Sequence, residues 1–190
     1  MRWFYTWFFP VLWIAYLVYW RVAALNAKTT QRLESLPSRI TRSVVFLIGV
    51  ALLSLPRIPI PWLYRSWIRP SLGTFYGGAA ITVAGLLFSV WARLHIGANW
   101  SSSVTIKQNH ELITSGPYAL VRHPIYTGLL TAFAGTALAL TEYRGLVAFP
   151  LFFFSLWYKL RLEEKWMRSQ FGQTYADYSR HTAALIPWLI

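Results

Sequence analysis

The residues most able to perform chemistry lie in one polar segment near the middle of the chain, from Gly116 to Gly128. Gly116-Pro117 predicts a turn at its start, because glycine and proline are the residues that most often interrupt regular structure. Pro124 suits the first position of a helix and disfavours helical geometry for the residue before it, His123. The imidazole is therefore expected at the entrance of a helix.

A helix entrance of this kind can bind an anion. The free backbone amides of the first turn, near Ile125 and Tyr126, carry a partial positive charge, and Arg122 adds a full charge. We expect a partly positive pocket for an anion such as the carboxylate of an amino-acid cofactor. Two alternatives remain open: His123 may serve only as a helix cap, and Tyr118 and Tyr126 as aromatic residues of the membrane interface.

Two adjacent acids, Glu163 and Glu164, follow the last apolar segment. Such a pair is costly next to a membrane unless each carboxylate has a partner. Neighbouring positions on a helix diverge by about 100°, so the two carboxylates are not expected to face the same point. We expect one to face a cationic cofactor group and the other to pair with a base such as Arg161 or Lys159. The alternative is a pair that lies on a solvated helix face.

Long uncharged runs must position these residues. Of the 190 residues, 56% are hydrophobic and only 13% are charged, about half the usual charged share. Three runs can each cross roughly 30 Å of hydrocarbon, and two shorter runs need help from flanking residues. The composition predicts an all-α, polytopic integral membrane bundle of about five transmembrane helices plus an interfacial C-terminal helix. The long runs are Trp3–Trp20, Leu72–Ala92 and Pro124–Thr141, and the short ones are Ser43–Pro56 and Gly145–Tyr158.

The basic residues flank these apolar runs and give the chain a net charge of +12. Because they do not form one polar stripe, membrane topology explains them better than binding to nucleic acid. With five spans and the N-terminus outside, most of them fall on the inner, cytoplasmic side, as the positive-inside rule favours, where anionic lipids are expected partners. His95 and His110 lack the carboxylate or cysteine neighbours of a metal site, so no metal is expected.

This topology divides one structural domain into two parts. Residues 1–95 supply three spans, and residues 96–190 hold the site, a two-span hairpin and an amphipathic tail. The loop before Pro124 and the tail after Tyr158 fall on the same inner face, so their polar residues can meet. Gly172 is expected to end the tail helix, and a short second helix would then place Tyr175 and Tyr178 on one face.

The fourth span also carries small residues along one face. Gly128, Ala132 and Gly135 recur at near-helical spacing. Such a face could line a substrate path, but close packing of helices is its more common use in membranes. We therefore expect it to pack against another helix.

The pattern Gly-Pro-Tyr-x-x-x-Arg-His-Pro-x-Tyr-x-Gly, followed by Glu163-Glu164, Phe171-Gly172, Tyr175, Tyr178 and Ile186-Pro187, resembles the isoprenylcysteine carboxyl methyltransferase family. The resemblance covers about half of the chain, from Trp100 onward. It implies S-adenosylmethionine as cofactor and a lipophilic or prenylated acceptor in the membrane. The residues that it implies for cofactor binding are Thr105, His110, the backbone of Glu111, Leu112, Ile113, Tyr118, His123, Pro124, Tyr126 and Glu163.

One position departs from that family. A substrate-binding arginine stands four residues before the first glutamate in the family, and Lys159 occupies this position here. Arg161 is a candidate substitute, because a lysine lacks the forked guanidinium that binds a carboxylate in a bidentate manner. Lys159, Arg161 and Glu164 are the predicted catalytic residues.

The implied reaction needs alignment more than acid–base chemistry. A carboxylate acceptor is ionised near neutral pH and needs no general base, while a phospholipid amine would need deprotonation. Lipid acids and quinone precursors also remain possible, and the pattern does not specify an oligomeric state. An NADPH-dependent membrane reductase of the steroid-reductase type and a non-enzymatic membrane scaffold are the alternatives. Paired acids disfavour a 2′-phosphate cofactor, and a scaffold leaves the dense central motif without a role.

Overall fold

The chain forms a bundle of helices in a computed structural model that describes residues 2–25, 35–97, 100 and 112–187. Within these ranges the regular structure is helical, apart from an isolated antiparallel bridge between Ser66 and Glu142. The predicted all-α fold is confirmed. The elements in chain order are α1 (Arg2–Ala24), α2 (Leu36–Ser54), the 3₁₀ turn η1 (Pro61–Tyr64), α3 (Leu72–Ile96), α4 (Pro117–Leu120), α5 (Pro124–Leu140) and α6 (Tyr143–His181).

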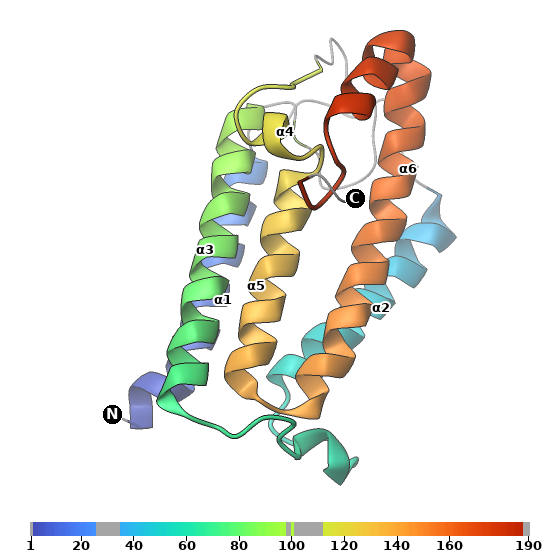
Figure 1. Ribbon diagram of the computed structural model, residues 1–190. Coiled ribbons are helices and arrows are strands. Elements are labelled where there is room, and N and C mark those ends of the chain that lie inside the picture. The colour runs from blue at the N-terminus through green and yellow to red at the C-terminus, as the bar shows by residue number, and fades with distance from the viewer. Residues whose placement is uncertain (1, 26–34, 98–99, 101–111, 188–190) are drawn as a thin grey trace.

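The long helices run beside one another and suit a membrane (Figure 1). Among the described residues, four helices are long and apolar enough to span one: α1 from Thr6 onward, α2, α3 and α6. Helix α5 has 17 residues, which cover about 26 Å at 1.5 Å per residue, close to the hydrocarbon thickness of about 30 Å. Many large apolar side chains on α1 and α2 are exposed, as expected of surfaces that face lipid. The protein is an integral membrane protein.

Helices α3 and α5 pack together through glycines. A Cβ atom added to Gly85 would lie 2.5 Å from the carbonyl oxygen of Gly128, and one added to Gly135 would lie 2.5 Å from the amide nitrogen of Thr82. Only residues without larger side chains permit such backbone contact. The small-residue face of α5 therefore packs against α3, as the sequence predicted.

Helices α2 and α6 are longer than the uncharged runs that predicted them. Helix α2 begins at Leu36, seven residues before the uncharged run that starts at Ser43, with Pro37 in its first turn. Helix α6 continues without a break from Tyr143 through the charged residues after Tyr158. A charge ends an apolar run but does not by itself end a helix, which stops at a glycine, proline or capping residue.

Gly172 interrupts α6 with φ 52° and ψ −122°. This positive φ changes the chain direction, and a short second helix then runs to His181 beside α4 and the start of α5 (Figure 1). Tyr175 and Tyr178 share one face there, with their ring centroids 6.0 Å apart. The predicted helix end and the shared face are confirmed.

The opposite end of the bundle is fastened by Arg144. Its Nε pairs with the Glu142 carboxylate at 2.5 Å, and its Nη1 donates to the Leu55 carbonyl at 2.8 Å. The turn between α5 and α6 is thereby tied to the end of α2. The hairpin that carries the polar residues is thus held at both ends.

Candidate functional site

The turn and the helix entrance predicted around the central motif are present. Gly116 adopts φ 60°, and Pro117 is the first residue of α4. A Cβ atom at Gly116 would lie 2.7 Å from the His95 ring, so the close approach also requires glycine. His123 has φ −124° and ψ 61° and directly precedes Pro124, the first residue of α5.

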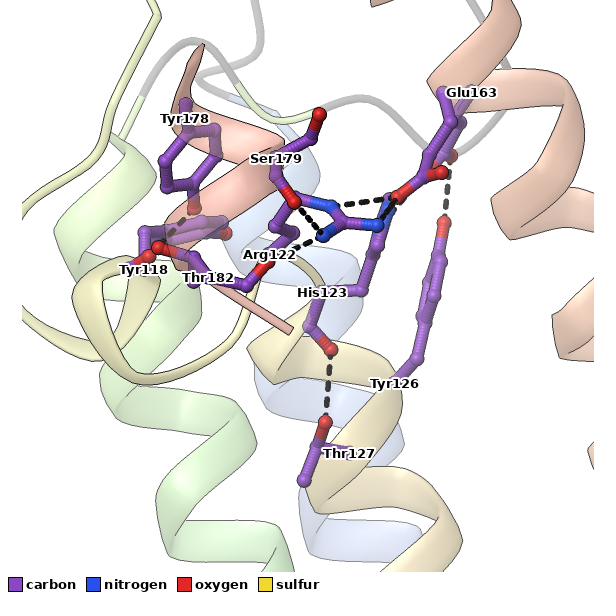
Figure 2. Close-up of polar contacts among 10 residues, drawn as sticks. Tyr118, Arg122, His123, Tyr126, Thr127, Glu163, Tyr178, Ser179 and Thr182 are labelled. Atoms are coloured by element: carbon purple, nitrogen blue, oxygen red, sulfur yellow. Dashed lines mark hydrogen bonds and ion pairs between the residues drawn. The ribbon is translucent and has the colours of Figure 1, made fainter. Parts of the chain in front are cut away.

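Arg122 binds the tail of the chain. Its Nε donates to Glu164 Oε1 at 2.7 Å, and its Nη2 lies 2.5 Å from the same oxygen. Its Nη1 donates to the carbonyls of Ser179, at 3.2 Å, and Thr182 (Figure 2). The sequence predicted that the Arg122 guanidinium contributes to a cofactor pocket. In the structure the guanidinium bonds to Glu164 on α6 and to carbonyls after the kink at Gly172, and so joins these two segments.

The same tail covers the start of α5. The His123 amide donates to the Ala184 carbonyl at 3.0 Å, and the Thr127 hydroxyl donates to the Leu185 carbonyl at 2.7 Å. The Tyr126 amide donates to the carbonyl of His123 at 3.0 Å. Of the two amides expected to bind an anion, the Tyr126 amide is therefore already bound to a carbonyl of the chain itself, and the anion pocket stays a prediction.

His123 lies between the two adjacent acids. Its Nδ1 is 3.6 Å from Glu163 Oε2, and its Nε2 is 3.5 Å from Glu164 Oε1. Its ring stacks on Tyr126, with the planes 4° apart (Figure 2). The expectation that the two carboxylates cannot face one point is wrong, because one imidazole is wide enough to bridge the angle between them.

This arrangement favours a charged imidazole. Burial acts to lower the pKa of His123, but the nearby carboxylates of Glu163 and Glu164 outweigh burial and raise that pKa above its ordinary value. The two acids thus stabilise the charged form of His123 relative to its neutral form.

Glu163 is the more accessible of the two acids. Its side chain is 22% exposed, against 10% for Glu164. The Tyr126 hydroxyl donates to Glu163 Oε1 at 2.6 Å, and Lys159 Nζ lies 3.8 Å from that oxygen. Both acids have a basic partner: Lys159 lies beside Glu163, as one of the two bases expected to pair with an acid, and Glu164 pairs with Arg122, which was not expected. The role of one acid in facing a cofactor stays a prediction.

Arg161 lies on another face of α6. It is exposed, and its guanidinium lies 5.9 Å from the centroid of the Trp157 ring. Two residues along a helix correspond to about 200° of rotation, so Arg161 and Lys159 point in opposite directions. The expectation that Arg161 replaces an arginine at position 159 is not supported by this geometry.

The remaining predicted cofactor residues are partly described. Tyr118 is buried, and its carbonyl accepts a hydrogen bond of 2.5 Å from the Tyr178 hydroxyl. Leu112 and Ile113 are half-buried, and Ile113 packs against the main core. Three predicted residues lie outside the described part of the chain: Thr105, His110 and Glu111.

A large apolar cavity adjoins the polar cluster. It has a volume of about 860 Å³ and lies between α1, α2, α5 and α6. Aromatic and aliphatic side chains form most of its wall, and polar groups reach it near the start of α5. We call it the lateral cavity. Its lining includes Trp13, Phe46, Phe133 and Leu156 among the apolar residues, and Arg42, Tyr126 and Lys159 among the polar ones.

Sequence reasoning missed two features of the site. The carbonyls of Ser179 and Thr182 bind Arg122, but a backbone carbonyl leaves no signal in residue type. Arg42 reaches the lateral cavity from α2, in a region where the sequence shows only generic hydrophobicity. A single charge near the start of an apolar run was the available signal.

The described residues hold no group of three histidines, cysteines or acids that could bind a metal ion.

Comparison with known proteins gives the family. A model of the phospholipid methyltransferase family matches residues 74–174, more than half of the chain. The cobalt-zinc-cadmium resistance protein CzcN of Cupriavidus metallidurans is 33% identical over 127 residues, which cover 65% of this chain and 53% of that protein. A probable protein-S-isoprenylcysteine O-methyltransferase of Oryza sativa subsp. indica is 29% identical over 127 residues, 66% of this chain and 61% of that protein.

A solved structure has a similar fold. The eukaryotic intramembrane Ras methyltransferase ICMT, an isoprenylcysteine carboxyl methyltransferase, matches with a TM-score of 0.56 and 25% identity over 80% of this chain and 52% of that one. The chain spans only about half to three fifths of the length of these relatives. The match includes the helices that carry the polar cluster and, in the family model, its central motif and both acids. The chain therefore belongs to the phospholipid methyltransferase family, with a fold similar to that of the isoprenylcysteine carboxyl methyltransferases.

Proposed function

We propose that the protein transfers a methyl group from S-adenosylmethionine to a carboxylate on a lipophilic acceptor in the membrane. The observation that carries this proposal is the junction of two different environments. The polar cluster around Glu163 adjoins a cavity of about 860 Å³ that lies between membrane helices. A polar cofactor and a lipid chain can therefore meet at Tyr126 and Lys159.

The residues of the cluster fit a zwitterionic, cationic cofactor. The carboxylate of Glu163 remains 22% exposed and can face an α-amine or a sulfonium. His123 Nε2 is buried and makes no hydrogen bond with any described residue, although it lies 3.5 Å from Glu164. Tyr118 and Tyr126 offer aromatic faces to a cation or an adenine. By resemblance, Leu112, Ile113 and Pro124 complete this side of the site.

The chain's contribution to the reaction is mainly positioning. Bound S-adenosylmethionine supplies an electrophilic methyl group on a sulfonium. The packed cluster fixes Glu163 through Tyr126 and Lys159, and holding two reactants in line can contribute several kcal/mol. The apolar wall of the cavity excludes water from an acceptor carboxylate, which makes that carboxylate a better nucleophile. Because this acceptor is already ionised, the residues need to remove no proton.

The reductase alternative fits this cluster poorly. A 2′-phosphate binds to basic residues, whereas the cluster contains two acids, Glu163 and Glu164. Arg122, a base of the cluster, is already bound to Glu164 and to the tail. The comparisons also name methyltransferases. An amine acceptor fits less well than a carboxylate, because Lys159 and Arg42 are the charged residues lining the cavity in the described part of the chain.

Transfer of radiolabelled methyl from S-adenosylmethionine tests this function. Purified protein in detergent is supplied with N-acetyl-S-farnesylcysteine or, separately, with phosphatidylethanolamine. We expect label in a base-labile methyl ester of the first acceptor, and its loss in Glu163→Gln but not in Asp177→Asn, an exposed acid distant in sequence. Label in the amine lipid alone would overturn the carboxylate assignment, and label in neither acceptor would contradict the proposal for both substrate classes.

A further inference from the structure

The charged residues that line the lateral cavity come from two different helices. Lys159 on α6 occupies the position where the family resemblance leads one to expect an arginine. Arg42 on α2 lines the same cavity, although its helix precedes the matched region, residues 74–174. Both line the cavity together with Tyr126, and Lys159 Nζ lies 5.4 Å from the centroid of the Tyr126 ring.

The backbone around Arg42 is fixed relative to α6. The Ser155 hydroxyl donates to the Arg42 carbonyl at 3.1 Å. Ser155 lies four residues before Lys159, which is one helical turn. This contact places the Arg42 backbone beside Ser155, one helical turn of α6 from Lys159.

Lys159 alone is poorly suited to bind an acceptor carboxylate. Its ammonium is 3.8 Å from Glu163 Oε1 and 5.4 Å from the centroid of the Tyr126 ring, so its charge is shared with an acid of the chain. A lysine also offers no forked pair of donors. A guanidinium, such as that of Arg42, does offer such a pair.

We infer that Arg42 determines the specificity of the cavity for an anionic acceptor, by binding the acceptor carboxylate together with Lys159. This role rests on the proposed function. The arginine that the family resemblance leads one to expect on α6 is thereby supplied from α2. The lipid chain of the acceptor then extends along α5, from Tyr126 toward Leu140 at the other end of the cavity.

The test compares a charged acceptor with its neutral carboxamide analogue. Binding of N-acetyl-S-farnesylcysteine and of its carboxamide is measured by competition, in the presence of S-adenosylhomocysteine. The wild-type protein should prefer the acid by about tenfold or more, as expected for a hydrogen-bonded charge pair. In Arg42→Met this preference should fall toward one, through weaker binding of the acid alone. Arg42→Lys, which keeps the charge, should retain part of the preference.

A matched control lies one turn away on the same helix. Arg39 is exposed and does not line the cavity, so Arg39→Met should keep the wild-type preference. S-adenosylhomocysteine binding should be unchanged in all three variants, which shows that each is folded. A wild-type protein without acid preference, or an Arg42→Met variant that keeps it, would overturn the role of Arg42. Failure of the wild-type protein to bind S-adenosylhomocysteine would instead contradict the proposed function itself.

Discussion

At the scale of single residues, the site is a row of alternating charges. Arg122, Glu164, His123, Glu163 and Lys159 follow one another, and each contacts the next within 3.8 Å. Each acid is flanked by bases on both sides, so the acids can be held close to a membrane at little cost. The more accessible acid, Glu163, is the one proposed to face the cofactor, and the buried one, Glu164, joins α6 to the tail through Arg122.

Removal of Arg122 should therefore destabilise the protein strongly. In Arg122→Met, Glu164 keeps only the more distant His123 among the bases of the row, and two side-chain hydrogen bonds to the tail are lost. Breaking a buried pair in this way costs about 3–5 kcal/mol. Thermal unfolding in detergent measures the loss. Arg180→Gln breaks an exposed pair with Asp177 and should cost less than about 1 kcal/mol. Equal losses in both variants would contradict the structural role of Arg122.

His123 should make stability depend on pH. Its pKa is raised in the folded protein, so the stability that its charge contributes is fully present below its ordinary pKa of about 6.5. That contribution is lost as the pH rises through the raised pKa. The difference in melting temperature between the wild-type protein and His123→Asn should therefore shrink toward alkaline pH. A difference that grows with pH would show that the imidazole is buried in its neutral form.

Part of this residue pattern was predictable and part was not. The turn at Gly116 and the helix entrance at His123 and Pro124 were predicted correctly, because glycine and proline restrict the backbone locally. The partner of Glu164 was not predictable, since Arg122 reaches it across 42 positions of sequence. Spacing along one helix favoured Arg161, three residues before Glu164, but its guanidinium lies near the Trp157 ring, 5.9 Å from the ring centroid.

At the scale of helices, the close contact between α3 and α5 depends on glycines, which have no side chain. Gly85→Ala would place its Cβ 2.5 Å from a backbone oxygen of α5, which cannot move aside like a side chain. Overpacking of this kind costs about 1–3 kcal/mol. Gly77 lies on the same helix with nothing within 4 Å of such a Cβ, so Gly77→Ala should be neutral or stabilising. Thermal unfolding compares the two, and a tolerant Gly85→Ala would contradict the close packing.

The sequence predicted these helices better than their ends. Hydrophobic runs located every long helix, because lipid demands apolar surfaces. The sequence predicted a separate tail helix where α6 in fact continues through charged residues. It did not predict that α2 also includes the charged residues before Ser43. Both stretches stay helical, since Arg42 and Lys159 extend into the lateral cavity. Such an inward-facing charge cannot be distinguished by composition from a charge at a helix end.

At the scale of the whole molecule, the lateral cavity joins the membrane helices to the site. Val50 on α2 lines this cavity, whereas Val44 on the same helix is exposed and does not. Val50→Trp should fill part of the space for the acceptor chain and raise KM for N-acetyl-S-farnesylcysteine roughly tenfold, the effect of about 1.4 kcal/mol. Val44→Trp should leave KM unchanged, and S-adenosylhomocysteine binding should persist in both. Equal KM values in the two variants would contradict this use of the cavity.

The orientation of the molecule stays a prediction. An outside N-terminus and a site on the cytoplasmic side rest on the distribution of basic residues. Structural similarity to the intramembrane methyltransferase supports the fold and leaves the sidedness open. The position of the polar cluster at one end of the bundle is consistent with a cofactor that enters from water (Figure 1).

The most direct measurement is calorimetric titration of the detergent-purified protein with S-adenosylhomocysteine, with NADPH as the comparison ligand. Our account predicts saturable binding of S-adenosylhomocysteine alone. That binding should be lost or strongly weakened in Glu163→Gln and kept in the control Asp177→Asn. Binding of NADPH in place of S-adenosylhomocysteine, or full binding by Glu163→Gln, would contradict it.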